Sequence, residues 1–121
     1  MKTIAVVEDN ADNRLLLSAI LGDLYRIVEY AGGPEALEGM RREPPDLVLL
    51  DISLPGMDGT QLLRHVRAER TLCRLPVVAL TAHAMTGDRE RYLALGFDHY
   101  LSKPIVDEND LLGAIERLLR D

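Results

Sequence analysis

Short apolar runs that alternate with segments of helical spacing constrain the fold of this chain more than any other feature of its sequence. The clearest run, "LVLL" at residues 47–50, is followed by Asp51 and then by the turn residues Pro55 and Gly56. An apolar run bounded by turn residues is typical of a strand covered on both faces, as in a parallel sheet. Asp51 is then expected at the carboxyl end of a buried strand, where open parallel α/β sheets bind ligands. Taken alone, an Asp at this place is equally consistent with a turn former or a helix cap.

The same alternation continues along the chain and predicts five strand–helix units. Strands are expected over residues 4–7, 26–31, 47–50, 77–80 and 99–101. Helices are expected over residues 12–24, around Leu37, around Leu62, over residues 87–95 and from Leu111 onward. Crossovers between parallel strands are right-handed and each strand needs covering, so the pattern predicts an α/β fold with a doubly wound five-stranded parallel sheet. The 121 residues have the size of one domain, which is expected to span residues 1–121.

Capping residues and apolar spacing place the helix ends. Asn10 or Asp12 is available as the N-cap of the first helix, and Thr86 is expected to cap the fourth helix, which closes at Gly96. The core stripe of the first helix is expected to consist of four residues: Leu17, Ile20, Leu21 and Leu24.

Composition excludes several classes of function. The net charge of −6 and the pI near 5.0 argue against binding to nucleic acid, whose affinity comes from Lys and Arg side chains that neutralise phosphates. The first ten residues, "MKTIAVVEDN", hold too few apolar side chains for a signal peptide or a membrane span. Cys73 is the only cysteine, so an intramolecular disulfide is excluded. We therefore expect a cytoplasmic protein that is not bound to a membrane and whose partners are proteins.

The residues that follow the predicted strands share a pattern. Four strands end in polar side chains: Glu8 and Asp9 after the first, Asp51 after the third, Thr81 after the fourth and Lys103 after the fifth. Because the carboxyl ends of parallel strands meet at one edge of the sheet, these acids, the hydroxyl and the amine are expected to converge on one crevice. Four independent turn residues would not produce this coincidence.

Four motifs carry a family resemblance: "VVEDN" at 6–10, "LVLLDISLPGMDG" at 47–59, "VVALTA" at 77–82 and "YLSKP" at 100–104. In this order and spacing they resemble the receiver domain of two-component response regulators along nearly all of the chain. The resemblance implies a flavodoxin-like sheet of strand order 2-1-3-4-5. It also implies a magnesium ion, and Asp51 as the acceptor of a phosphoryl group from a histidine kinase or a histidine phosphotransfer protein.

The chemistry of these residues agrees with that resemblance. Phosphoryl transfer needs a nucleophile in line, a cation that neutralises the phosphoryl oxygens and donors aimed at the charge of the transition state. Asp51 can form an aspartyl phosphate. Glu8, Asp9 and Asp51 cannot crowd together as bare anions, so a divalent cation is expected among them, and hard oxygen ligands suit Mg²⁺.

The receiver pattern assigns further roles. It implies that Asp9 and Asp51 bind the metal directly, that the main-chain carbonyl of Ser53 completes the protein ligands, and that Glu8 acts through water. It implies that Lys103 pairs with one phosphoryl oxygen, while the Thr81 hydroxyl and the N–H of Ala82 bind another. In this pattern the Lys103–Pro104 bond is a candidate cis peptide.

Other residues match the family less specifically. Tyr100 matches the switch aromatic that turns inward when Thr81 moves toward phosphate, although a Tyr half-buried at a strand end would look the same. His83 and Ser53 occupy places where family members tune the access of water to the phosphate. The three histidines, His65, His83 and His99, lie in separate elements without ligand spacing and are expected at the surface.

Three successive leucines in the first helix predict a docking surface. Leu15, Leu16 and Leu17 fan out over about 200° at 100° per residue, so they cannot all face the sheet. Leu15 shares a face with small residues beside the acidic crevice, and Gly22 on that face indicates either a close approach to the helix or a frayed helix end. We expect Leu15 to contact the phosphodonor protein, against the alternative of an ordinary exposed leucine.

These features favour a single-domain, monomeric response regulator that passes its phosphorylation state to a downstream target protein or relays the phosphoryl group onward. Such a chain is not an enzyme beyond its own phosphorylation and dephosphorylation. One alternative is an Asp-nucleophile phosphatase of the haloacid dehalogenase type, although Ser53 stands where its second Asp would be. A receiver cut from a hybrid histidine kinase and a pseudo-receiver that serves only as a binding module are the others.

Overall fold

Residues 1–82, 85–103, 105 and 107–120, which the computed structural model describes, contain a parallel sheet of five strands in the order β2-β1-β3-β4-β5. The strands are β1 (Thr3–Val7), β2 (Arg26–Tyr30), β3 (Leu47–Asp51), β4 (Val77–Thr81) and β5 (His99–Ser102). The helices are α1 (Ala11–Leu21), α2 (Gly33–Arg42), α3 (Gly59–Ala68), α4 (Asp88–Leu95) and α5 (Glu108–Leu119). The predicted fold class and strand order are confirmed.

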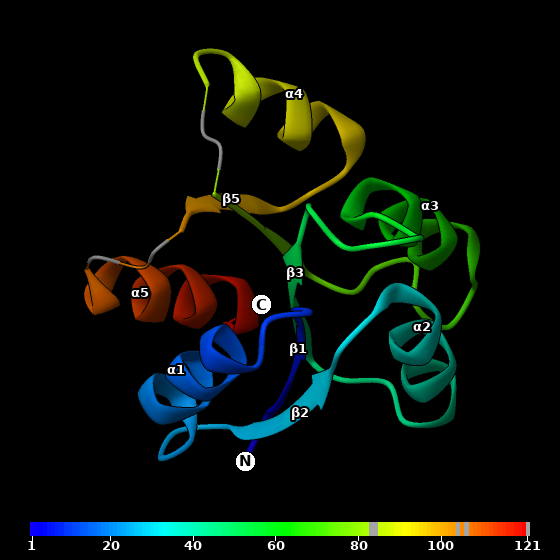
Figure 1. Cartoon of the computed structure of the whole chain (residues 1–121). Helices are drawn as coiled ribbons and strands as arrows, with labels where there is room; N and C mark the ends of the chain where they lie inside the picture. The colour runs from blue at the N-terminus through cyan, green and yellow to red at the C-terminus, as the bar shows by residue number, and fades with distance from the viewer. Residues whose placement is uncertain (83–84, 104, 106, 121) are drawn as a thin grey trace.

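Two apolar layers cover the sheet. Figure 1 shows α1 and α5 on one side and α2 and α3 on the other. Along β1, Ile4 and Val6 pack with α1 and α5, whereas Ala5 and Val7 pack with α2 and α3. Alternate side chains of one strand therefore enter different cores, which is why the central strands are continuously apolar.

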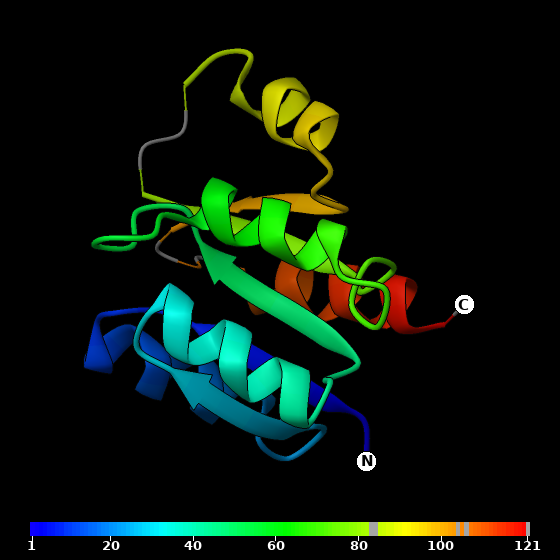
Figure 2. The same cartoon turned by 90° about the vertical axis from the view of Figure 1, so that its right-hand side faces the viewer.

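The register of the strands brings their carboxyl ends together. Asp51 pairs with Leu80 of β4, and Thr81 pairs with Ser102 of β5, so β3, β4 and β5 end within one residue of one another. In Figure 2 the arrowheads of β2 and β3 point to the same side of the molecule. The polar residues that follow the strands consequently share one edge of the sheet.

The first helix differs from its prediction at one end. Asn10 is its N-cap, and the Asn10 side chain accepts a hydrogen bond from the N–H of Asn13. The helix ends at Leu21, with Gly22 as its C-cap, so the assignment of Leu24 to the core stripe was wrong: Leu24 is 55% exposed. Tyr25 packs against the core instead, because the turn after Leu21 rotates the chain before β2 begins.

The expected cap of the fourth helix was also wrong. Gly87, not Thr86, precedes α4, and its φ of +88° is a left-handed conformation that glycine adopts without a steric penalty. Asp88 accepts a hydrogen bond from the N–H of Met85, which closes the turn before the helix. The predicted end at Gly96 is confirmed, with a φ of +116°.

Arg67 of α3 connects its helix to the segments that precede β4 and β5. Its guanidinium donates hydrogen bonds to the main-chain carbonyls of Cys73, Leu75 and Gly96, at 3.1, 2.6 and 2.8 Å, and contacts Asp98 at 3.0 Å. It thereby ties the end of α3 to the loops that lead into β4 and β5.

We predict that Arg67→Ala lowers the free energy of unfolding by roughly 2–4 kcal/mol, because several partly buried carbonyls lose a charged donor. Arg64→Ala, one turn earlier on the exposed face of α3, should change stability by less than about 0.5 kcal/mol. Urea unfolding of both variants measures the difference. Equal denaturation midpoints would contradict the role given to Arg67.

Candidate functional site

A lysine and two buried carboxylates form the centre of the site. Lys103, directly after β5, places its Nζ 2.9 Å from Glu8 Oε2 and 3.1 Å from Asp51 Oδ2. Glu8 follows β1 and is 1% exposed, while Asp51 ends β3 and is 2% exposed. Buried charges are stable only when they are paired, so this ion pair is the electrostatic basis of the site.

Burial and ion pairing shift the pKa values of Glu8 and Lys103. Burial raises the pKa of Glu8, and the neighbouring charge of Asp51 raises it further, against hydrogen bonds from Lys103 and Asn13. Burial alone would lower the pKa of Lys103, but its hydrogen bonds to Glu8 and Asp51 outweigh this effect and the pKa rises. Lys103 therefore stays charged between the two acids.

Asp9 completes an acidic group with Glu8 and Asp51. Each of the three carboxylates offers an oxygen, and these oxygens lie within 4.8 Å of one another. Asp9 is exposed, whereas the other two are buried, so the group opens to solvent on one side. Hard oxygen donors around an open position fit Mg²⁺, which keeps several water ligands in proteins.

The loop after Asp51 is fixed to that residue. The N–H of Ser53 donates to Asp51 Oδ1 at 3.0 Å, so Ser53 lies beside the carboxylate, with its side chain exposed. At the start of α3, Gly59 donates from its N–H to the carbonyl of Ile52 at 3.0 Å. A Cβ on Gly59 would lie 2.6 Å from the carbonyl oxygen of Asp51, so only glycine allows this approach.

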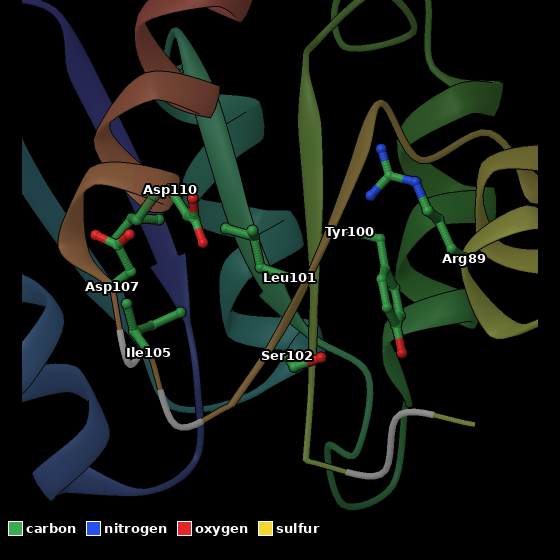
Figure 3. A pocket seen from close by; sticks show the side chains of 8 residues that line it. Arg89, Tyr100, Leu101, Ser102, Ile105, Asp107 and Asp110 are labelled. Atoms are coloured by element: carbon green, nitrogen blue, oxygen red, sulfur yellow. The ribbon is translucent and has the colours of Figure 1, made fainter. Parts of the chain in front are cut away.

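Thr81 and Tyr100 lie on the same face of the sheet. Thr81 is buried at the end of β4, its carbonyl accepts a hydrogen bond from the N–H of Lys103, and Ala82 after it is exposed. Tyr100 pairs with Ala79, two residues before Thr81, so both side chains point to the α3 side of the sheet. In Figure 3 the ring of Tyr100 points to that side, and Leu101 points to the other.

The Tyr100 side chain is turned inward. It is 8% exposed, and its ring stacks on that of Tyr92 at a centroid distance of 5.6 Å. Burial raises the pKa of Tyr100, and within the described part of the chain its hydroxyl has no hydrogen-bond partner. The predicted switch, in which the ring turns inward when Thr81 moves toward phosphate, stays a prediction.

The remaining candidates occupy different surfaces. Leu15 is 69% exposed on α1, while Leu16, which is 44% exposed, lines a small cavity with Lys103. His65 is exposed on α3, but His99 is half-buried on β5, and no histidine belongs to a group that could hold a metal in the described ranges. His83 and Pro104 lie outside the described residues.

A second hollow lies over β5 (Figure 3). Arg89 of α4 lines it on one side and Asp107 and Asp110 at the start of α5 line it on the other. It contains none of the residues of the acidic group, so it forms a separate surface.

Two contacts of the site were missed by reasoning from the sequence. Asn13 donates from Nδ2 to Glu8 Oε1 at 3.3 Å, and Arg14 donates from Nη1 to the main-chain oxygen of Glu8 at 2.7 Å. Asn13 lies three residues after the N-cap Asn10, and Arg14 lies four residues after it. Side chains in the first turn of α1 point back toward the N-terminus of the helix, where Glu8 lies. The spacing from the N-cap was the only feature of the sequence that could have predicted these two contacts.

No helix found in the described residues is both long and apolar enough to span a membrane.

Comparison with known proteins agrees with this geometry. The model of the response regulator receiver domain family matches residues 4–116. The receiver domain of the sensor histidine kinase PA1611 from Pseudomonas aeruginosa, solved with a magnesium ion in its active site cleft, is 36% identical with a TM-score of 0.89, covering 99% of this chain and 98% of that one.

Two curated relatives differ in how much of their length this chain spans. The polar-differentiation response regulator DivK of Brucella ovis is 39% identical over 86% of this chain and 85% of its own length. The sensor protein GacS of Pseudomonas syringae is 43% identical over 84% of this chain, which spans only 12% of the length of GacS. With the acidic group, Thr81 and Lys103 at the carboxyl ends of a 2-1-3-4-5 sheet, the chain belongs to the response regulator receiver domain family.

Proposed function

We propose that the chain is a single-domain response regulator, residues 1–121, in which Asp51 accepts a phosphoryl group from a histidine kinase or histidine phosphotransfer protein. It then signals by phosphorylation-dependent contact with a target protein or relays the phosphoryl group onward. The observation that carries the proposal is Lys103, held 2.9 and 3.1 Å from Glu8 and Asp51 at the sheet edge. That it is cytoplasmic, monomeric, not an enzyme in the ordinary sense and without nucleic-acid partners stays a prediction.

Each residue of the site has a role in this transfer. An oxygen of Asp51 bonds to phosphorus as the phosphorus–nitrogen bond of the donor phosphohistidine breaks and the imidazole takes up a proton. Lys103 pairs with one phosphoryl oxygen, and the Thr81 hydroxyl and the Ala82 N–H bind another. These donors stabilise the charge that the transition state spreads over the phosphoryl oxygens.

The acidic group fits a bound Mg²⁺. Asp9 and Asp51 would hold it directly, with the main-chain carbonyl of Ser53, and Glu8 would contribute through water. When bound, the ion offsets the charge of the carboxylates and of the phosphoryl oxygens. The magnesium ion in the active site cleft of the PA1611 receiver supports a magnesium ion at this place.

Three alternatives are separated from this proposal by different experiments. The match to GacS supports a receiver that belongs to a hybrid kinase, and sequencing the full gene separates this from a stand-alone regulator. A phosphatase of the haloacid dehalogenase type would need an acid where Ser53 stands. Rapid multiple turnover of phosphate esters would support the phosphatase, and absence of any adduct from acetyl phosphate would support a pseudo-receiver.

Asp51→Asn should abolish the Mg²⁺-dependent adduct formed with acetyl phosphate, as read by intact-protein mass spectrometry. It should also stabilise the metal-free fold by ~1 kcal/mol, a rise in Tm of roughly 4 °C, because it removes one of three crowded carboxylates while the Lys103–Glu8 pair remains. Phosphorylation at another residue, or a lower Tm than the parent without metal, would contradict this.

Thr81→Ala should still accept the phosphoryl group, more slowly, but should fail to transmit it toward Tyr100. Amide chemical shifts between residue 83 and Tyr100 should then stay unchanged on addition of beryllium fluoride and Mg²⁺. Ser102→Ala, which removes a hydroxyl from the paired position on β5, should respond as the parent does. If the Thr81→Ala shifts move as in the parent, the coupling runs through other residues.

Leu15 is proposed to contact the phosphodonor. A receiver must bring Asp51 to a histidine on another protein. Leu15 is 69% exposed on α1, the helix that follows residues 8–10, which we call the acidic loop. Gly22 is the C-cap of that helix, and a Cβ there would lie 2.6 Å from the Ser18 carbonyl, so the helix end accounts for this glycine without a partner.

Leu15→Arg should slow transfer from the cognate phosphohistidine protein at least about tenfold, a loss of ~1.4 kcal/mol, because a charge enters an apolar contact. Transfer from acetyl phosphate should not change. Leu24→Arg, at another exposed leucine beyond the far end of α1, is the matched control and should leave both rates unchanged. If the variant is phosphorylated as fast as the parent by both donors, docking through Leu15 is refuted. If both rates fall by the same factor, Leu15 supports the pocket instead.

A further inference from the structure

Arg14 links α1 to both the acidic loop and strand β2. It is half-buried, and its Nη1 donates to the main-chain oxygen of Glu8 at 2.7 Å. Its Nε lies 3.2 Å from Glu29 Oε1, and the other oxygen of Glu29 accepts a hydrogen bond from Ser18 at 3.2 Å. The guanidinium is therefore held from one side by Glu29 while it holds Glu8 on the other.

The oxygen that Arg14 holds belongs to the peptide joining Glu8 to Asp9. Because a peptide unit is planar, fixing this oxygen also fixes the nitrogen and Cα of Asp9. Asp9 is exposed, and its side chain has no hydrogen bond to any residue that the structure describes. Its carboxylate therefore depends on the backbone for its position.

We propose that Arg14 is a positioning residue for the acidic group: by holding the Glu8–Asp9 peptide, it places the carboxylate oxygens of both residues for a divalent cation. Asn13 complements it by holding the Glu8 carboxylate at 3.3 Å. The inference rests on the proposed function in one respect, that the group binds Mg²⁺. Residues that orient metal ligands in this way affect affinity although they do not touch the metal.

The sign of the effect separates positioning from simple electrostatics. Arg14 is a cation beside an anionic pocket, so Coulomb repulsion alone predicts that its removal strengthens Mg²⁺ binding. Positioning predicts the opposite. A purely structural role predicts a lower stability with unchanged affinity for the metal.

The test is a calorimetric titration of the metal-free protein with Mg²⁺ alone. Arg14→Ala should raise the Kd roughly 10- to 100-fold. Arg14→Lys keeps the charge but loses the planar fork that reaches both Glu8 and Glu29, and it should raise the Kd roughly 3- to 10-fold, a partial rescue. Arg26→Ala is the matched control, because Arg26 lies at the start of β2, away from Glu29, and pairs with Glu43. The Kd of this variant for Mg²⁺ should stay within about twofold of that of the parent.

A second measurement is the rate of phosphorylation by acetyl phosphate as a function of Mg²⁺. The Arg14→Ala rate should approach that of the parent at saturating Mg²⁺, because the defect lies in binding. An Arg14→Ala Kd equal to or below that of the parent would overturn the inference. Should this variant not fold, an Arg14→Lys Kd equal to that of the parent would overturn it. A parent that binds no Mg²⁺ would instead refute the proposed function.

Discussion

Burial of like charges at the carboxyl edge of the sheet is the constraint on which the site depends. Glu8 and Asp51 are almost completely buried, and Lys103 is the ammonium that contacts both. One ammonium cannot balance three carboxylates, so the pocket keeps an excess of negative charge beside an opening at Asp9. An apolar sheet on one side and an unbalanced charge on the other make this edge selective for cations and for groups that arrive with them.

The scaffold holds this charged group through its main chain as much as through its side chains. Arg14 contacts the carbonyl of Glu8, Gly59 lies against the carbonyl of Asp51, and the N–H of Lys103 donates to the carbonyl of Thr81. Each of these contacts is made to the main chain of a site residue and leaves the side chain of that residue without the contact. The carboxylates and the amine therefore stay available while their positions are constrained.

The strand ends could be predicted because parallel strands bring their carboxyl ends to one edge. Glu8 and Asp51 directly follow apolar runs, and Lys103 directly follows the short strand β5, so the pattern that located the strands also located the site. Leu24 and Thr86 were assigned wrongly because helix ends depend on the local turn, at Gly22 in one case and at Gly87 in the other. Arg14 was missed because a hydrogen bond to a main-chain carbonyl leaves no periodic mark in the sequence.

The inward Tyr100 ring has an energetic consequence. Among the residues that the structure describes, the Tyr100 hydroxyl has no partner, and a buried hydroxyl in that state costs roughly 1–3 kcal/mol, which opposes the gain from packing the ring against Tyr92. A rotation toward water would give the hydroxyl a hydrogen-bond partner and would lose the contact with Tyr92. Since ~1.4 kcal/mol changes a population ratio tenfold, the free energy lost at this hydroxyl is of the size that decides between two orientations of a ring. Burial of the Tyr100 ring and hydration of its hydroxyl therefore oppose each other.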